Sequence, residues 1–367
     1  MTAAGAGGPR SLVVTGVGVV DADGFDFRTA LGRRGYKYLP AASQYFLAAA
    51  KRALAHAGEG SLTAADPQAR GAAVGTNSAA AALHDAMDRT VIGAGAAELS
   101  PLTAPYFSVN LFGSRLATEH ALKAFNLTFT SPRVAGLEAL QTGLRAVAAG
   151  RAGWLLAGAT EEALPPHEPG AKTSEAGAVA LVLEPARAVA ARGGLPRGRV
   201  AVRTFFLPPR EAASARGAEA AGELLADALA ALGPGGGAYG PYDRPGQSGP
   251  YSQSGPYAPS SPYPPRGPFG LDGLDVTAVL DDSAVGRAVA AALGEGARTV
   301  PAGAGCLAPV LRVAGALGPE GGDGRPRAVV TAAAEGNAAV CLIVPETGQR
   351  SPGPPGTPAS SEPAESR

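Results

Sequence analysis

The sequence is poor in charged, aromatic and cysteine residues, and these shortages exclude several classes of protein. Charged residues occupy 17% of the 367 positions, and 31 basic residues balance 31 acidic ones. The chain therefore lacks the positive excess that is typical of nucleic-acid binding. Two cysteines, Cys306 and Cys341, are too few for a disulfide framework or a cysteine-rich zinc site. Since the four histidines show no metal-ligand spacing, we expect no metal.

Long apolar runs are also missing. No stretch of about 18 uncharged apolar residues exists, and the first ten residues contain no apolar segment after a basic flank. We therefore expect a cytoplasmic protein without a membrane partner. No Gly-x-Gly-x-x-Gly motif is followed by an acidic residue at the spacing of dinucleotide-binding folds, and we expect no cofactor.

Glycine and proline are abundant, with 52 and 33 copies, and they concentrate in a few segments. Residues 346–367 are rich in Pro, Ser and Glu, so we predict a disordered tail there and a disordered N-terminus over residues 1–9. Residues 233–270 repeat Gly-Pro-Tyr units and predict an extended low-complexity loop. Two interpretations of this loop stay open: a tolerated insertion, or a tyrosine-rich segment that binds a partner.

The remaining sequence divides into two blocks, residues 10–185 and 197–345, in which predicted strands and helices alternate. The first block predicts strands at 11–15, 72–76, 127–130, 154–157 and 178–184, and helices at 41–57, 83–91, 114–125 and 136–149. The second predicts strands at 199–206, 276–280, 327–331 and 338–344, and helices at 211–232, 284–293 and 306–317. Continuous apolar strands between helices indicate an α/β protein with buried sheets, and the similar blocks suggest a duplicated fold.

Several segments of the first block occur in the order in which β-ketoacyl synthases have them. Residues 12–20 resemble the opening strand and turn of that family, residues 38–50 its first long helix, and residues 71–76 its next strand. Residues 174–184 are similar to its Gly-Glu-Gly-Ala-Gly-x-x-x-Leu strand. The resemblance covers residues 10–185 and only parts of the second block. It implies the thiolase-like fold, with two duplicated α/β halves whose sheets lie between helices, the second half reduced.

The family's nucleophilic cysteine is replaced in this sequence. In the family it lies before a helix, in a Thr-x-Cys-x-Ser-Gly-Leu-x-Ala pattern, where the helix N-terminus favours a thiolate. Alignment on Gly136, Leu137 and Ala139 places Arg133 at the cysteine position. Arginine has no deprotonated form near neutral pH, so it cannot attack a thioester.

Both family histidines are missing as well. The segment that would carry the first, residues 276–284, contains Asp282 but no histidine, and Cys306 occupies the position of the second. The family's late Gly-Phe-Gly-Gly-x-Asn turn keeps only Asn337. No catalytic residue is therefore predicted. The candidate pocket residues are Arg133, Ser131, Val134, Asp282 and Asn337.

This pattern resembles the chain-length factor, the β-subunit of type II polyketide synthases. The resemblance implies a ketosynthase-like subunit, inactive on its own, within a family of β-ketoacyl-carrier-protein synthases, which are acyltransferases. The implied partners are an active ketosynthase α-subunit, in a heterodimer, and an acyl carrier protein whose phosphopantetheine holds the growing chain. In the family the strand before the nucleophile helix pairs across the dimer axis. That strand predicts an interface at Asn126, Leu127, Thr128, Phe129 and Thr130.

Other interpretations stay open at this point. A divergent acyltransferase would use Ser131 or Cys306 as its nucleophile and would need a base within hydrogen-bonding reach. A scaffold or interaction protein would retain only the fold. Arg133 would either bind a malonyl carboxylate or a phosphopantetheine phosphate, or form a salt bridge in a vacant pocket. A homodimer is the alternative to the heterodimer.

Overall fold

The computed structural model describes residues 12–232, 273–318 and 324–346. The expectations for residues 1–9 and 233–270 fall outside these ranges, as does the predicted tail beyond Glu346. Within the described residues, none of the helices is long and apolar enough to cross a membrane.

Ten strands form one continuous sheet in the order β3-β2-β4-β5-β1-β6-β10-β9-β7-β8. The strands of the first half are β1 (Leu12–Asp21), β2 (Arg70–Gly75), β3 (Phe125–Phe129), β4 (Trp154–Glu161) and β5 (Gly177–Pro185). Those of the second half are β6 (Gly198–Phe206), β7 (Asp275–Leu280), β8 (Ala297–Pro301), β9 (Arg327–Ala332) and β10 (Asn337–Pro345).

The strand order is a mirrored repeat, which shows the duplication that sequence similarity alone does not. In the first half, β2 runs parallel to β3 and β4, whereas β5 runs antiparallel to β4 and β1. In the second half, β7 runs parallel to β8 and β9, whereas β10 runs antiparallel to β9 and β6. The halves meet where β1 pairs with β6 through Val14 and Gly198. Each strand of one half therefore has a counterpart in the other.

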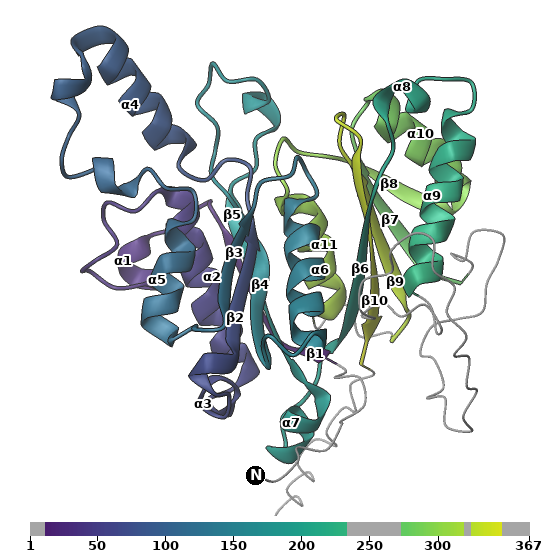
Figure 1. Ribbon diagram of the computed structural model, residues 1–367, viewed down its shortest axis with the longest axis horizontal. Helices are drawn as coiled ribbons and strands as arrows, with labels where there is room; N and C mark the ends of the chain where they lie inside the picture. Colours follow the sequence, from purple (N-terminus) through teal and green to yellow (C-terminus); the bar gives the residue numbers. More distant parts are fainter. Residues whose placement is uncertain (1–11, 233–272, 319–323, 347–367) are drawn as a thin grey trace, which may run out of the picture.

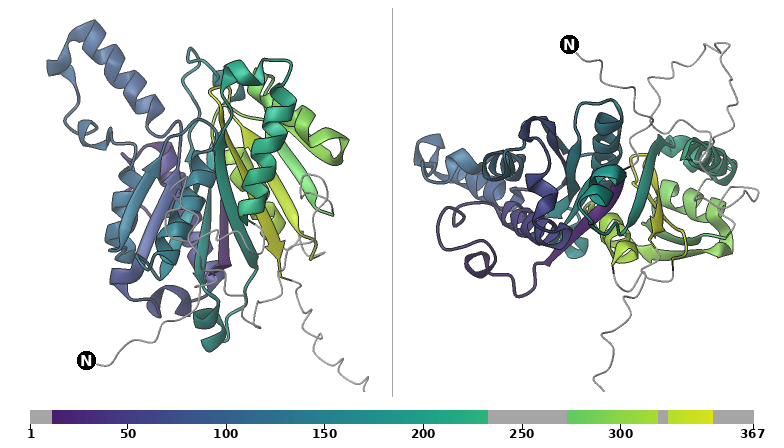
Figure 2. Two further views of the ribbon diagram at one scale, coloured as in Figure 1. Left: turned by 45° about the vertical axis from the view of Figure 1, so that its right-hand side comes forward. Right: turned by 90° about the horizontal axis from the view of Figure 1, so that it is seen from below.

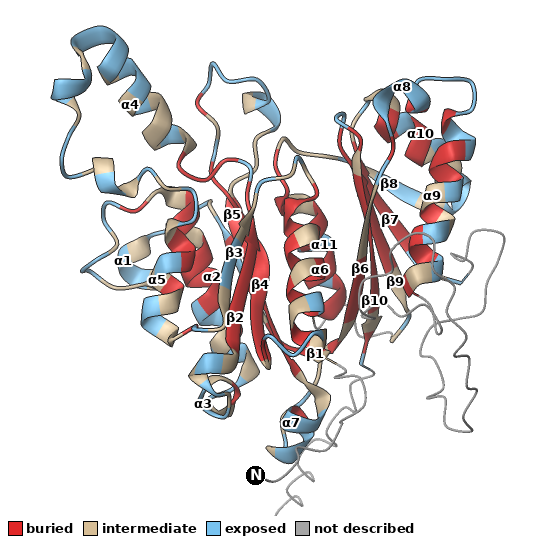
Figure 3. Cartoon of the chain, in the orientation of Figure 1, coloured by how far each residue is buried: buried red, intermediate tan, exposed pale blue. Residues whose placement is uncertain are grey.

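Helices cover both faces of each half of the sheet, which gives five layers (Figure 1). The outer layers contain α2 (Ala41–Ala57) with α5 (Leu111–His120), and α9 (Gly217–Leu232) with α10 (Ala284–Leu293). The central layer consists of α6 (Ala135–Ala148) and α11 (Leu307–Leu317), whose buried faces appear in Figure 3. The remaining α-helices are α1 (Phe27–Ala30), α3 (Gly60–Thr63), α4 (Ala81–Ala94), α7 (Ala186–Ala191) and α8 (Pro209–Ala212).

The central layer contacts both halves of the sheet, whereas α4 extends away from the body, as Figures 1 and 2 show. One core cluster contains Leu140 of α6, Val310 of α11, Leu181 of β5 and Cys341 of β10. The two halves therefore share a core around α6 and α11. This arrangement brings the ends of strands from both halves to the N-termini of the two central helices.

Several sequence-based expectations differ from the structure. The predicted helix 114–125 ends at His120, because Ala121 takes a left-handed conformation with φ 51°, and Phe125 begins β3. The predicted helix 211–232 is two helices, α8 and α9. Strand β8 was not predicted. The turn expected at residues 16–18 is the middle of β1.

The glycines of β1 allow a helix to pack closely on the strand. A Cβ atom added at Gly16 would lie 2.1 Å from the carbonyl oxygen of Ala53, and one at Gly18 would lie 2.0 Å from that of Ala49, both in α2. These distances are far below contact distance, and the opposing atoms are backbone. The two glycines are therefore packing residues within a strand.

We predict that Gly18→Ala destabilises the fold by about 2–4 kcal/mol, because strand and helix must separate to admit the new methyl group. A urea unfolding curve measures this change. Gly93→Ala is the matched control: Gly93 lies in α4 with open space around its Cβ position, so the change should stabilise by up to about 1 kcal/mol. Equal unfolding midpoints for the two variants would contradict the packing argument.

Candidate functional site

Arg133 lies in the turn between β3 and α6, at the N-terminus of the central helix. Its backbone is left-handed, with φ 60°, a conformation that is costly for a residue with a side chain. Its N–H donates to Oδ1 of Asn77 over 3.2 Å, and Asn77 follows strand β2. This hydrogen bond links the turn before α6 to the end of β2, in the same half of the chain.

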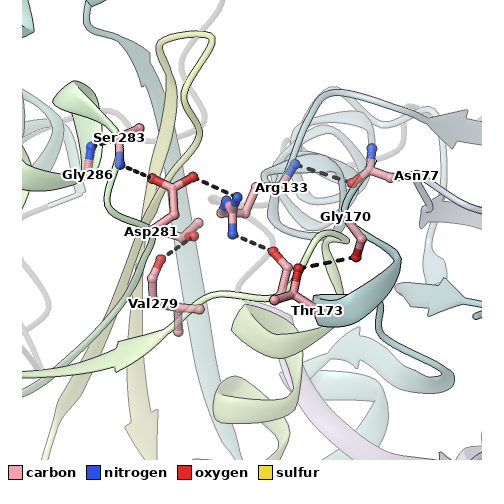
Figure 4. A network of polar contacts seen from close by, with 10 residues as sticks. Asn77, Arg133, Gly170, Thr173, Val279, Asp281, Ser283 and Gly286 are labelled. Carbon is pink, nitrogen blue, oxygen red and sulfur yellow. Dashed lines mark hydrogen bonds and ion pairs between the residues drawn. The ribbon is translucent and has the colours of Figure 1, made fainter. Parts of the chain in front are cut away.

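The Arg133 guanidinium joins the first half to the second (Figure 4). Its Nη2 donates to Oδ2 of Asp281 over 2.9 Å, and its Nη1 donates to the carbonyl oxygen of Gly303. The side chains of Arg133 and Asp281 are 12% and 26% exposed, so the ion pair is largely shielded from solvent. Asp281 follows β7 and Gly303 follows β8, so one side chain links three strand ends. The position aligned with the nucleophile therefore meets the segments aligned with both histidines.

The acid that contacts Arg133 is Asp281, the residue before the predicted pocket candidate Asp282. Asp282 is exposed, and its carbonyl oxygen accepts a hydrogen bond from the side chain of Arg287. Asp281 also accepts a hydrogen bond from the N–H of Ser283 over 3.0 Å, which fixes the carboxylate at the start of α10. The sequence places two acids side by side after β7 and gives no signal for which one turns toward the first half.

Cys306 is the N-cap residue of α11 and is completely buried. Its carbonyl oxygen would lie 3.2 Å from a Cβ atom at Gly136, which places it against α6. Burial and the negative charge of Glu161 raise the pKa of the Cys306 thiol well above its ordinary value. The thiolate form of Cys306 is therefore strongly disfavoured.

Two glutamates organise the site, the fully buried Glu161 and the partly buried Glu175, and the sequence analysis missed both. Glu161, at the end of β4, accepts hydrogen bonds from the N–H groups of Asn77, Ser78 and Cys306 at 2.7–2.9 Å. Glu175 accepts from the N–H groups at the start of α11. Burial raises the pKa of Glu175, although these two hydrogen bonds oppose the shift. A carboxylate at a helix N-terminus is favourable, so both groups stabilise the loop that leads into α11.

The glycines of the loop after β8 are the local signal for these glutamates. A Cβ atom at Gly303 would lie 2.4 Å from Glu175, and one at Gly305 would lie 2.7 Å from Glu161. Each glycine of Gly303-Ala304-Gly305 thus leaves room for one carboxylate. The two glycines can be interpreted in this way only once the structure shows that the loop lies against Glu161 and Glu175.

The other predicted pocket residues lie in different surroundings. The hydroxyl of Ser131 donates to the carboxylate of Glu138 in the first turn of α6. Val134 is buried in the shared core. Asn337 begins β10 opposite Phe206 of β6. Of the predicted pocket residues, Arg133 is the one that reaches across to the second half.

Four of the five predicted interface residues, Asn126 to Phe129, lie in the edge strand β3, and Thr130 follows it. Within the described residues, β3 pairs on one side with β2, and its other side has no strand. Asn126 and Leu127 are exposed, and Leu127 retains 37% of its accessible surface. The counterpart edge, β8, carries Arg298 and Pro301, residues that discourage pairing. β3 has neither a charge nor a proline.

No group of three or more His, Cys, Asp or Glu side chains is placed to hold a metal ion in the part of the chain that the structure describes.

We predict that neither cysteine reacts with a thiol reagent in the native protein. Burial raises the pKa of both thiols, so the reactive thiolate stays scarce even at about pH 9. Ellman's reagent should report two thiols per chain in denaturant and almost none without it. Rapid native labelling that Cys306→Ala removes would contradict the buried geometry and would favour Cys306 as a nucleophile.

The duplicated halves, the shared central helices and the convergence of strand ends at Arg133 define a thiolase-like fold of the ketosynthase kind. The model of the β-ketoacyl synthase N-terminal domain matches residues 12–198. The chain therefore belongs to the β-ketoacyl synthase family. No curated protein matches it in a sequence search.

Solved structures agree on the fold. A type II polyketide synthase ketosynthase bound to its acyl-carrier protein, AntDE:AntF, aligns with a TM-score of 0.66 at 15% identity, over 92% of this chain and 99% of that one. The ishigamide ketosynthase/chain length factor aligns with a TM-score of 0.63 at 20% identity, over 91% and 99%. A β-ketoacyl synthase from Burkholderia phymatum STM815 aligns with 0.64 at 13%, over 92% and 100%. At these identities the likeness shows the fold alone.

Proposed function

We propose that this chain is a non-catalytic, ketosynthase-like subunit that pairs with an active β-ketoacyl synthase during acyl-chain assembly on an acyl carrier protein. The observation that carries the proposal is the ion pair between Arg133 and Asp281. It occupies the meeting point at which the family places a cysteine and two histidines. A cation held by a carboxylate can neither attack a thioester nor transfer a proton near neutral pH.

Within the described residues, no histidine is hydrogen-bonded to either alternative nucleophile; the acidic neighbours are Glu138 beside Ser131 and Glu161 beside Cys306. All four histidines of the chain lie within the described residues, and their hydrogen bonds go elsewhere: His56 bonds to Val17, His84 to Phe107 and His167 to Arg89. His120 is partly buried near Arg70. Ser131 has only the carboxylate of Glu138 as a partner, and Cys306 is buried. The geometry therefore favours a non-catalytic subunit over a divergent acyltransferase.

A difference between the two edge strands of the sheet supports association with a second subunit. They are equivalent in the duplicated fold, yet β8 is protected by Arg298 and Pro301 whereas β3 presents uncharged Asn126, Leu127 and Thr128. The Thr128 hydroxyl is buried without a hydrogen-bond partner in the described residues. An unprotected edge strand of this composition is suited to a second subunit. Because this chain lacks a nucleophile, a partner that supplies one favours a heterodimer over a homodimer.

The structural neighbours suggest two types of partner. One neighbour is a ketosynthase in complex with an acyl-carrier protein, and another is a ketosynthase/chain length factor pair. We infer the same two partner types for this chain, and the cytoplasm as its compartment.

Co-expression tests the proposal. An affinity-tagged copy of this chain should retain an untagged ketosynthase from the same organism that has an intact cysteine and both histidines, and the purified pair should extend an acyl chain on the carrier protein. Failure to retain the ketosynthase, together with normal solubility alone, would instead favour the scaffold interpretation.

A further inference from the structure

One nitrogen of the Arg133 guanidinium is buried without a hydrogen-bond partner in the described residues. Nη1 and Nη2 donate to Gly303 and Asp281, whereas the buried Nε has no hydrogen-bond partner in the described residues. Nε and Nη2 lie on the same side of the guanidinium, where they form the two-pronged fork that binds a carboxylate with both oxygens. Asp281 uses one prong of this fork.

We propose that Arg133 builds a carboxylate-binding site and that Asp281 is its internal occupant, which keeps the former nucleophile position closed. The ligand class of the site is a small carboxylate. The inference rests on the proposed function, since it concerns how that non-catalytic site is closed.

Both partners are anchored independently of the ion pair, which distinguishes it from an ordinary surface salt bridge. The backbone of Arg133 is held in a left-handed turn by Asn77, and Asp281 is held by the N–H of Ser283. The charges therefore meet without a large loss of side-chain freedom. Because the two residues come from different halves, the pair also fastens the halves together across the site.

One further acid lies close to the fork. Burial raises the pKa of Glu175, and the positive charge of Arg133 offsets a small part of this rise. Glu175 is already bonded to Leu307 and Ala308 at the start of α11. The Glu175 carboxylate is therefore a second negative charge near Arg133 that does not occupy its Nε and Nη2 donors. A carboxylate ligand in place of Asp281 would have both charges as neighbours.

Chemical rescue in the full-length chain tests the inference. Asp281→Ala removes the internal carboxylate and should lower the melting temperature by about 3–6 °C in chloride buffer. Sodium acetate or sodium malonate, at matched ionic strength, should restore at least half of that loss by binding Arg133. The unmodified chain should show no such carboxylate-specific shift. The matched control is Asp282→Ala, which removes the adjacent, exposed carboxylate and should neither lose stability nor respond to acetate.

Two further variants keep the test decisive. Asp281→Asn retains an acceptor for the Ser283 N–H and removes only the charge, so it should fold if the alanine variant does not, and should still lose stability. In the double variant Arg133→Met/Asp281→Ala, acetate should restore nothing. Two results would overturn the inference. One is an acetate-dependent rise in melting temperature that remains in the variant without Arg133. The other is a rise for Asp281→Ala, in acetate or malonate, that is no larger than the rise for Asp282→Ala. These melting temperatures depend on neither condensation activity nor partner binding. The carboxylate site can therefore be disproved while the proposed function holds, and the proposed function can be disproved while the carboxylate site holds.

Discussion

Purified alone, this chain is expected to produce no condensation product from malonyl-carrier and acyl-carrier substrates above the enzyme-free rate. The physical reason is that nucleophile and proton-transfer groups act as a unit, so loss of all of them removes the rate enhancement and not a fraction of it. The Arg133→Cys variant should also give no condensation product above the enzyme-free rate. It restores a thiol at the aligned position, but Asp281 and the buried Cys306 still stand where histidines are needed.

The assay requires an active ketosynthase as its positive control, because carrier-protein substrates fail for many reasons. A rate well above background that survives mutation of both Ser131 and Cys306 would show that the alignment of Arg133 with the nucleophile is wrong. A rate that Ser131→Ala abolishes would favour the divergent acyltransferase, with Glu138 as the group that orients the hydroxyl.

Leu127→Asp is expected to abolish co-purification with the ketosynthase, with affinity weakened by at least about 100-fold. Leu127 is 37% exposed on the unpaired edge strand β3, so a partner seated there would bury it. An aspartate at that position would be buried without a partner charge, which costs several kcal/mol. A pull-down with the tagged variant, quantified against the unmodified chain, measures the effect.

The control is Leu195→Asp. Leu195 is 84% exposed and follows α7, outside the β3 edge, so its replacement should leave co-purification unchanged. Phe129→Asp is a poorer test, because Phe129 packs against the shared core and its loss would destabilise the subunit itself. Melting curves of both leucine variants should match that of the unmodified chain. Normal retention of the ketosynthase by a folded Leu127→Asp protein would place the interface elsewhere.

The sequence predicted the elements whose signals are local. Helices 41–57 and 284–293 have the predicted bounds, since apolar residues recur at helical spacing and Gly58 and Gly294 follow their last residues. The duplicated α/β class is also confirmed. Strand β8 escaped prediction because its five residues include Arg298 and Pro301, which do not resemble a buried strand. It belongs to the sheet only through its pairing with β7.

The alignment with the family proposes Arg133 as the candidate position but does not say which residues contact it. Alignment placed Arg133 at the turn before α6, and the structure shows that turn facing the segments aligned with the histidines. The choice of Asp281 over Asp282, and the roles of Glu161 and Glu175, depend on contacts between residues more than 80 positions apart. Contacts between residues so far apart in the sequence cannot be predicted from the spacing of neighbouring residues. They follow only from the order and direction of the strands in the sheet.

Size-exclusion chromatography with light scattering, performed on the chain co-expressed with an active ketosynthase from the same organism, tests the central claim most directly. The account predicts one peak whose mass equals one copy of each subunit, together with poor solubility of this chain when it is expressed alone. A well-behaved monomer of 36.2 kDa, unchanged by the presence of the ketosynthase, would contradict it.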